Sequence, residues 1–307
     1  MRGLTITHEA ELRATVEKLS DGDNLTNVCP SQWRGEPLPS QQSVKEIIAH
    51  SRALIFPGFF GDSDVTRENV LYFTGLWTEK LFNLLTEQIH AGMSMDICTE
   101  TPPQFTLLEE EAARKAAAFI QRLPELRRLL NLDVRATYHG DPAAESTQEV
   151  IYCYPGIRAI CNYRIAHELV KLGVPILPRM ISEQAHAETG IDIHPSATIG
   201  ESFTIDHGTG IVIGATAIIG DNVKIYQGVT LGAKSFSLDS DGNPVKGVPR
   251  HPVIGNNVII YSNASILGRI SIGDNAIIGG NIWVDTDVAP GERLIQAKAN
   301  NVLRLKQ

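Results

Sequence analysis

The chain has 307 residues, of which 43% are hydrophobic and 20% are charged, and its formal net charge at pH 7 is -8. This composition is ordinary for a globular protein, and the length favours two domains. A mildly acidic chain lacks the basic face that broad nucleic-acid binding needs, so we expect no nucleic-acid partner.

The N-terminal residues lack the apolar core of a signal peptide, and the longest apolar stretches are short and interrupted. We therefore expect neither export nor a membrane partner. The cysteines form no Cys-x-x-Cys pair, which is typical of free thiols in a reducing compartment; they are Cys29, Cys98, Cys153 and Cys161. The sequence predicts a cytoplasmic protein.

A helical N-terminal domain is predicted over residues 1–188. Ser43 with Glu46 forms a capping box, and the apolar residues after it recur on one helix face. The same spacing recurs over residues 70–85. Segments of this kind are typical of scaffold helices, so the periodicity alone gives no function.

Two more helices are predicted in the second half of this region. Thr106 with Glu109 forms a second capping box, which starts an Ala-rich helix predicted to end near Arg122. A later helix over residues 157–172 is predicted to stop at Gly173, because glycine and the proline two positions later break the pattern.

From Ile191 onward an aliphatic residue recurs at every sixth position, interrupted by a slip of two residues near Gly208 and by a loop before Ile254. The repeated positions are Ile193, Ile199, Ile205, Ile213, Ile219, Ile225, Leu231, Ile254, Ile260, Ile266, Ile272, Ile278 and Val284. A six-residue period predicts a parallel β-helix, in which each repeat supplies one strand and one turn. A β-sandwich would instead alternate at period two. The predicted fold is α+β, with the β-helix over residues 189–288 and a C-terminal tail over 289–307.

Departures from the repeat indicate where chemistry could lie. Asp192 and His207 are 15 residues apart, roughly one coil, so they could meet on neighbouring turns. A carboxylate beside an imidazole orients it and raises its basicity, and such a pair can deprotonate a hydroxyl. The alternative is a capped turn with an exposed histidine. A further departure is the insertion over residues 233–252.

Three histidines in this region raise the alternative of a zinc site: His194, His207 and His251. Zinc bound in a trimer of β-helices would suggest a γ-class carbonic anhydrase. Their spacing fits that ligand set poorly, so we expect no metal.

Several motifs resemble the serine O-acetyltransferase family of hexapeptide-repeat acyltransferases. They are Asp192-Ile-His-Pro-Ser-Ala-Thr-Ile-Gly, Ile205-Asp-His-Gly-Thr-Gly, Gln227-Gly-Val-Thr-Leu-Gly, Arg250-His-Pro, Asp141-Pro-Ala-Ala and Tyr163-Arg-Ile-Ala-His. The resemblance covers about residues 135–285. It implies a left-handed β-helix and acetyl transfer from acetyl-CoA to L-serine, giving O-acetylserine and CoA, the first step of cysteine biosynthesis.

The resemblance also implies a role for each matching residue. His207 would be the general base and Asp192 would orient it. The serine ammonium group would contact Asp141 and Asp206, and the serine carboxylate would contact Arg250 and His251. Acetyl-CoA would lie in a groove between subunits, against the backbone amides of Gly232, Ala233 and Ser262, with Lys234 and Lys246 as candidates for its phosphates.

The partners implied by the resemblance are only partly fixed. A homotrimer and a dimer of trimers both suit the family, and inhibition by L-cysteine varies within it, so both questions stay open. Many members bind the next enzyme, a sulfhydrylase, through a C-terminal isoleucine. This sequence ends in Lys306-Gln307, so we expect no tight complex through the tail.

Two other functions remain as alternatives. Another hexapeptide acetyltransferase, acting on a sugar, an amino sugar or an antibiotic, would keep a histidine base but should lack the zwitterion-binding set. A non-catalytic trimeric scaffold would have no need of the intact Asp192 and His207 pair.

Overall fold

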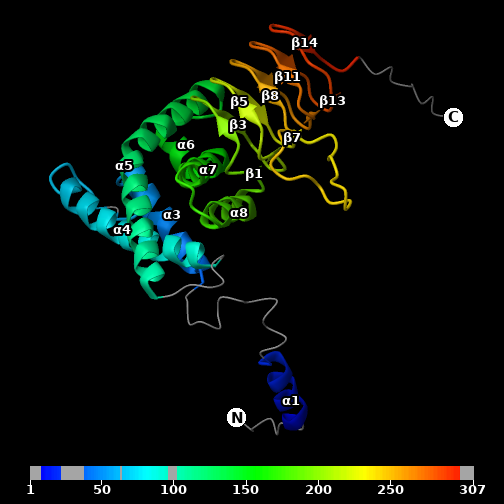
Figure 1. Cartoon of the computed structure of the whole chain (residues 1–307). Coiled ribbons are helices and arrows are strands. Elements are labelled where there is room, and N and C mark those ends of the chain that lie inside the picture. The colour runs from blue at the N-terminus through cyan, green and yellow to red at the C-terminus, as the bar shows by residue number, and fades with distance from the viewer. Residues whose placement is uncertain (1–7, 22–37, 63, 96–101, 298–307) are drawn as a thin grey trace.

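The computed structural model describes residues 8–21, 38–62, 64–95 and 102–297, which form a helical region followed by a β-helix (Figure 1). The helices are α1 (Glu9–Leu19), α3 (Gln41–Ile55), α4 (Val70–Ser94), α5 (Pro102–Gly140), α6 (Thr147–Cys153), α7 (Pro155–Lys171) and α8 (Leu177–Thr189). None of these helices is both long enough and apolar enough to span a lipid bilayer. The predicted helical region and β-helix are confirmed; of the predicted tail over residues 289–307, residues 298–307 lie outside the described residues.

Two predicted helices have the wrong ends. The N-cap of α3 is Ser40, because its hydroxyl accepts the N–H of Ser43 at 3.2 Å, so the helix starts before the capping box read from the sequence. Helix α5 starts before Thr106, whose side chain lies outside the described residues, and runs through Pro124 to Gly140. Burial of one face of α5 on both sides of this proline outweighs its missing N–H.

The β-helix consists of very short parallel strands, arranged as three sheets (Figure 1). The first sheet has the order β1 (Asp192–Ile193), β4 (Val212–Ile213), β7 (Thr230–Gly232), β10 (Ser265–Leu267) and β13 (Trp283–Val284). The second has the order β11 (Ser271–Ile272), β8 (Val253–Ile254), β5 (Ile218–Ile219) and β2 (Thr198–Ile199). The third has the order β14 (Arg293–Leu294), β12 (Ile277–Ile278), β9 (Ile259–Ile260), β6 (Lys224–Tyr226) and β3 (Thr204–Asp206).

Each sheet contributes one column of aliphatic side chains to the interior. Every repeated residue predicted from the six-residue period is buried. In the first sheet Ile193 is aligned with Ile213, which is aligned with Leu231 on the next coil. Stacking of like side chains on successive coils removes them from water and fixes the register of the coils.

The helical region is fastened to the first coil by a buried ion pair. Arg164 of α7 forms two bonds to the carboxylate of Asp133 of α5, at 2.6 and 2.8 Å. The same carboxylate accepts the N–H of Phe203 at 3.0 Å, and Arg164 also donates to the carbonyl of Gly200. This network fixes the end of α5 beside the coils, which places Asp141.

Candidate active site

His207 lies in the corner that joins β3 to β4, which we call the His207 corner (residues 206–211). Asp206 pairs with Tyr226, and Val212 pairs with Thr230, so this corner is two residues longer than the corner one coil further along. The slip in the six-residue period is therefore a lengthened turn. It carries the His207 side chain outward, and 80% of that side chain is exposed.

The backbone of this corner explains its sequence. His207 has φ 56°, in the left-handed region, where the other coils have asparagine or glycine, such as Asn263 and Gly228. Gly208 has φ 95°, and a Cβ atom there would lie 2.5 Å from Ile191. Glycine at 208 is thus required by both conformation and space, whereas a histidine with positive φ is uncommon and is typical of a functional position.

A cavity of about 470 Å³ opens between this corner and the helical region, and it contains His207, Asp206 and Asp141. Asp141 follows α5. Its carboxylate accepts the Tyr154 hydroxyl at 2.7 Å and the Ala143 N–H at 2.8 Å. These bonds lower the pKa of Asp141, and the same contact raises the pKa of Tyr154 to about 12. Asp141 is therefore ionised at neutral pH.

Helix α7 brings Tyr154 to this cavity because it packs directly on β3. A Cβ atom at Gly156 would lie 2.7 Å from the carbonyl oxygen of Ile205, so only glycine permits this approach. Asp206, at the end of β3, lies 2.8 Å from the ammonium of Lys224 and 3.7 Å from Nε2 of His207. The cavity thus contains two carboxylates beside an imidazole.

Asp192 lies on β1, at the start of the first coil. No hydrogen bond joins it to His207 in the described chain; ligand atoms of Asp192, Glu183 and His186 lie within 4.8 Å of one another instead. Thr209 and Gly210, which follow His207, contact the chain at Gly190, next to this strand. The role of Asp192 as the orienting carboxylate stays a prediction.

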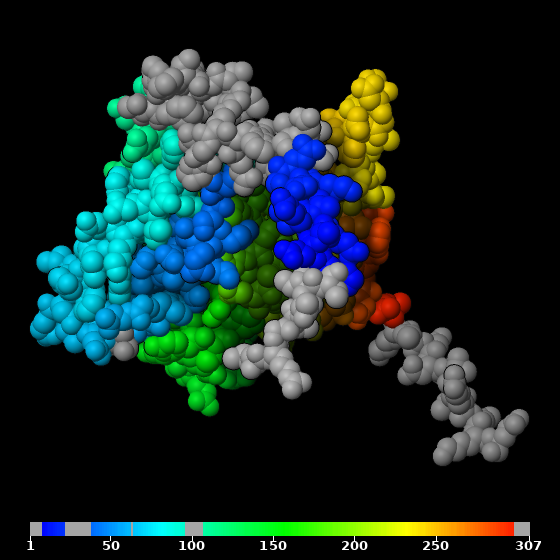
Figure 2. Space-filling view, turned by 90° about the horizontal axis from the view of Figure 1, so that it is seen from below, coloured from blue at the N-terminus to red at the C-terminus, as the bar shows by residue number. Residues whose placement is uncertain are grey.

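Arg250 and His251 end the insertion between β7 and β8, which we call the Arg250 arm (residues 233–252). The yellow arm stands out from the coils in Figures 1 and 2. A separate cavity of about 210 Å³ lies at its base, lined by Arg250, Arg269 and Phe236 among others. No acidic side chain among the described residues forms an ion pair with Arg250, and its Nε atom is buried without a partner.

His251 is held as a neutral hydrogen-bond donor. Its Nδ1 atom accepts the N–H of Thr216 at 3.1 Å and lies 2.8 Å from the Thr216 hydroxyl, so the proton of the neutral ring resides on Nε2. Burial lowers the pKa of His251 to about 4, assisted by the positive charge of Arg250. The ring is therefore uncharged at neutral pH and can donate from Nε2.

The two groups of residues lie at opposite edges of the first sheet. The His207 corner precedes β4, whereas the Arg250 arm follows β7, and His207 and Arg250 line different cavities. Within one chain, the structure therefore brings together His207, Asp206 and Asp141, and separately Arg250 and His251.

The residues predicted to contact acetyl-CoA also lie at the two opposite edges of the first sheet. Ser262 lies in the corner of a later coil, on the same side as His207, whereas Gly232 and Ala233 lie at the edge that carries the arm. Lys234 forms an ion pair with Asp285 at 2.8 Å, and Lys246 is exposed on the arm.

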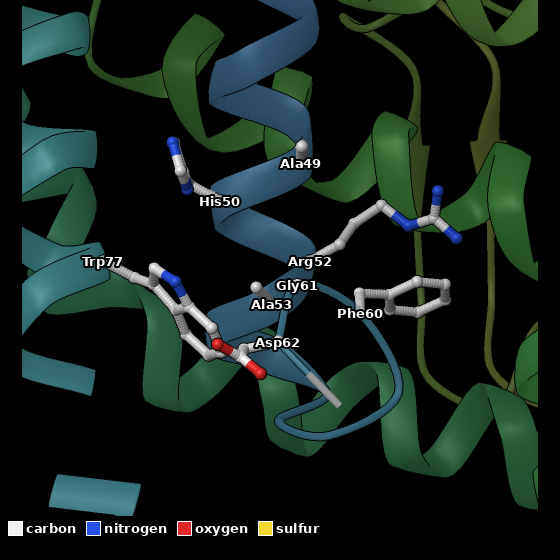
Figure 3. A pocket seen from close by; sticks show the side chains of 8 residues that line it. All are labelled: Ala49, His50, Arg52, Ala53, Phe60, Gly61, Asp62 and Trp77. Carbon is white, nitrogen blue, oxygen red and sulfur yellow. The ribbon is translucent and has the colours of Figure 1, made fainter. Parts of the chain in front are cut away.

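A larger cavity, of about 680 Å³, lies in the helical region and contains none of the predicted site residues. His50 and Trp77 lie on one side of α3, while Arg52 is stacked over Phe60 at 3.9 Å on the other (Figure 3). His50 and Asp62 both line this cavity, but no hydrogen bond or ion pair joins these two side chains among the described residues.

The sequence analysis missed Tyr154 and Lys224. Tyr154 stands just before the helix predicted over 157–172, and Lys224 is one of many outward-facing residues in the repeat. The available signal for Lys224 was its place on a predicted strand of the β-helix, three positions before the motif at 227–232. A lysine at such a position does not by itself differ from a solvated side chain.

Comparison with known proteins shows which family the chain is similar to. Residues 251–281 match the family model described as bacterial transferase hexapeptide (six repeats). The protein named "Serine acetyltransferase, plasmid" of Synechococcus elongatus is 50% identical over 264 residues, which are 85% of this chain and 83% of that protein.

Solved structures are similar as well. Serine acetyltransferase 1 of Entamoeba histolytica, in complex with L-cysteine, has a TM-score of 0.70 and 36% identity over 81% of this chain and 86% of that one. The serine acetyltransferase of Neisseria gonorrhoeae, in complex with serine, has a TM-score of 0.52 and 27% identity over 84% and 96%. With a relative this similar over most of its length, the chain belongs to the serine acetyltransferase family.

Proposed function

We propose that this chain transfers the acetyl group of acetyl-CoA to the hydroxyl of L-serine, with His207 as the general base. The observation that carries the proposal is the cavity in which His207 lies beside Asp141 and Asp206. An exposed imidazole can remove a proton, and two carboxylates can bind an ammonium group. We place the reaction in an acetyltransferase domain of residues 189–288, with Asp141 contributed by the helical domain of residues 1–188.

The reaction needs one proton relay. His207 removes the hydroxyl proton of serine as the oxygen attacks the thioester carbon. Backbone N–H groups of the coils are the available donors to the oxyanion. The C–S bond then breaks, and the imidazolium returns the proton to the CoA sulfur. No acyl-enzyme and no metal ion is required by this sequence of steps.

Serine is a zwitterion, and the charges of the site match it. Asp141 and Asp206 bind its ammonium group, while Arg250 and the Nε2–H of His251 bind its carboxylate. Arg250 has no acidic partner among the described residues, which leaves its guanidinium available. Because these sets lie at opposite edges of one sheet, we propose that each complete site forms between two copies, in a homotrimer or a dimer of trimers.

The same arrangement accounts for the acetyl-CoA residues. If two copies meet, Ser262 of the first faces Gly232, Ala233, Lys234 and Lys246 of the second, and the groove between them holds the co-substrate. The E. histolytica enzyme was solved with L-cysteine bound. Cysteine has the same zwitterion as serine, so we propose that it inhibits this enzyme by binding to the same groups.

Asp192→Asn should slow turnover by less than a change of His207 does. The imidazole remains, and only its orientation and the stabilisation of its charge are lost. Steady-state kcat of the two variants tests this. A larger loss from Asp192→Asn than from the His207 variant would assign Asp192 another role, for instance in the contact with Glu183 and His186.

Arg250→Ala should raise the KM for serine strongly and leave the KM for acetyl-CoA nearly unchanged. A carboxylate that loses a bidentate partner loses about 2–3 kcal/mol of binding. Arg250→Lys is the matched control: it keeps the charge but loses the planar fork, and it should lie between the wild type and Arg250→Ala. Equal effects on both substrates would place Arg250 in the acetyl-CoA groove.

The function itself is tested by release of the CoA thiol from acetyl-CoA. Serine should support release far faster than homoserine, glucosamine or no acceptor. Preference for the amino sugar would favour a different hexapeptide acetyltransferase, and no release with any acceptor would favour a scaffold.

A further inference from the structure

Lys224 lies on the outer side of the β-helix, where a lysine is expected to be solvated, but its side chain is largely buried. It lies on the outer side of β6, yet only 16% of its side chain is exposed. Its ammonium lies 2.8 Å from Oδ2 of Asp206, donates to the carbonyl of Gly140 at 2.7 Å and lies 4.7 Å from the centre of the Tyr226 ring. It therefore joins the third sheet to the end of α5.

Both polar contacts of Lys224 lead to the acids of the candidate site. One partner is Asp206 itself, and the other is Gly140, the residue before Asp141. Gly140 is the last residue of α5, where carbonyl groups lack helical partners and a positive charge is favourable. The Lys224 ammonium thus fixes the backbone next to Asp141 and the side chain of Asp206.

The charge of Lys224 also balances the site. Two carboxylates that face one ammonium ion carry one negative charge too many, and repulsion raises the pKa of one of them when no other cation is present. Together with the Lys224 ammonium, the two carboxylates have a net charge of −1, which matches the single positive charge of one substrate ammonium group. The titratable and charged groups around Asp206 are Lys224, Tyr226, His207, Asp141 and Tyr154.

We propose that Lys224 is a positioning residue for the acceptor, which holds the backbone at Asp141 and the side chain of Asp206 in place. This inference rests on the proposed function. The acceptor is then a hydroxyl compound with a free α-ammonium group. An N-acylated serine is excluded, because it has no cation for Asp141 and Asp206 to bind.

Kinetics of three variants test the role. Lys224→Met should raise the KM for serine by about tenfold, the effect of one charge-assisted bond, with little change in kcat or in the KM for acetyl-CoA. Lys224→Arg should restore most of the affinity. Lys115→Met is the matched control, because Lys115 is equally buried and bonds Glu111 and a carbonyl. It lies 25 residues before Gly140, about 38 Å along α5.

The pH profile separates positioning from a loss of stability. In Lys224→Met, one carboxylate should take up a proton at a higher pH than in the wild type, so on acidification the KM for serine should rise earlier than in the wild type. The Lys115 variant should follow the wild type.

Titration of the aspartate carboxyl carbons by NMR gives a readout that is independent of activity. It should show one carboxyl whose pKa is higher in Lys224→Met than in the wild type or in Lys224→Arg. A wild type without serine-dependent thiol release would refute the proposed function. If the wild type is active, the role of Lys224 would be refuted by a Lys224→Met protein in which neither the KM for serine nor the titration of the carboxyl groups has changed.

Discussion

His207→Asn should lower kcat by at least ~10²-fold, the low end of the contribution of a general base. Asparagine is the informative replacement because later coils have asparagine at left-handed corner positions, including Asn263 and Asn281. It therefore keeps the backbone conformation with φ 56° and removes only the basic nitrogen. The loss should appear in kcat at saturating serine and acetyl-CoA.

A second variant separates the chemistry from the fold. His207→Ala should lose as much activity as His207→Asn and in addition some stability, because alanine disfavours a positive φ. His207→Asn should keep the thermal transition of the wild type, and the transition of His207→Ala should lie a few degrees lower at most. Near-normal turnover in a folded His207→Asn protein would remove His207 from the mechanism.

Arg164→Met should destabilise the protein by about 3–5 kcal/mol, because it leaves the carboxylate of Asp133 buried without its cation. The Asp133 side chain is fully buried and Arg164 is 4% exposed. The measurement is chemical denaturation followed by circular dichroism. Serine affinity should fall as well, since the pair holds α5 against the coils and so places Asp141.

Arg114→Met provides the control, on α5, the helix that carries Asp133. Arg114 pairs with Glu111 at 2.6 Å, but 69% of its side chain is exposed, so its loss should cost less than about 1 kcal/mol. Equal destabilisation by the two variants would show that the buried pair does not fasten the two regions together.

The β-helix could be predicted residue by residue because its period is visible in the sequence. All of the repeated aliphatic residues are buried, and the two-residue slip is the lengthened corner at His207. Helix ends were harder to predict. Ser40 and Ser43 are equally good caps by type, and only the tertiary bond between Ser40 N–H and Gln88, at 2.6 Å, favours the first.

The site could be predicted as a set of residues but not as an arrangement. The motifs name His207 and Arg250 without stating that they leave the first sheet at opposite edges, because that depends on how many residues each turn contains. Lys224 and Tyr154 were missed for a related reason. Their partners, Asp206 and Asp141, lie 18 and 13 residues away in the sequence and meet them only after the coils and α7 have packed.

The central claim is that the hydroxyl of serine is acetylated while its amine stays protonated between two carboxylates. The most direct test supplies acetyl-CoA labelled with ¹³C at the carbonyl and follows the product by NMR at a pH below 7, where acetyl migration from oxygen to nitrogen is slow. We predict that the first product is the ester, O-acetylserine, formed in step with free CoA. N-acetylserine as the first product, or labelled acetyl bound to the protein before serine is added, would contradict the account.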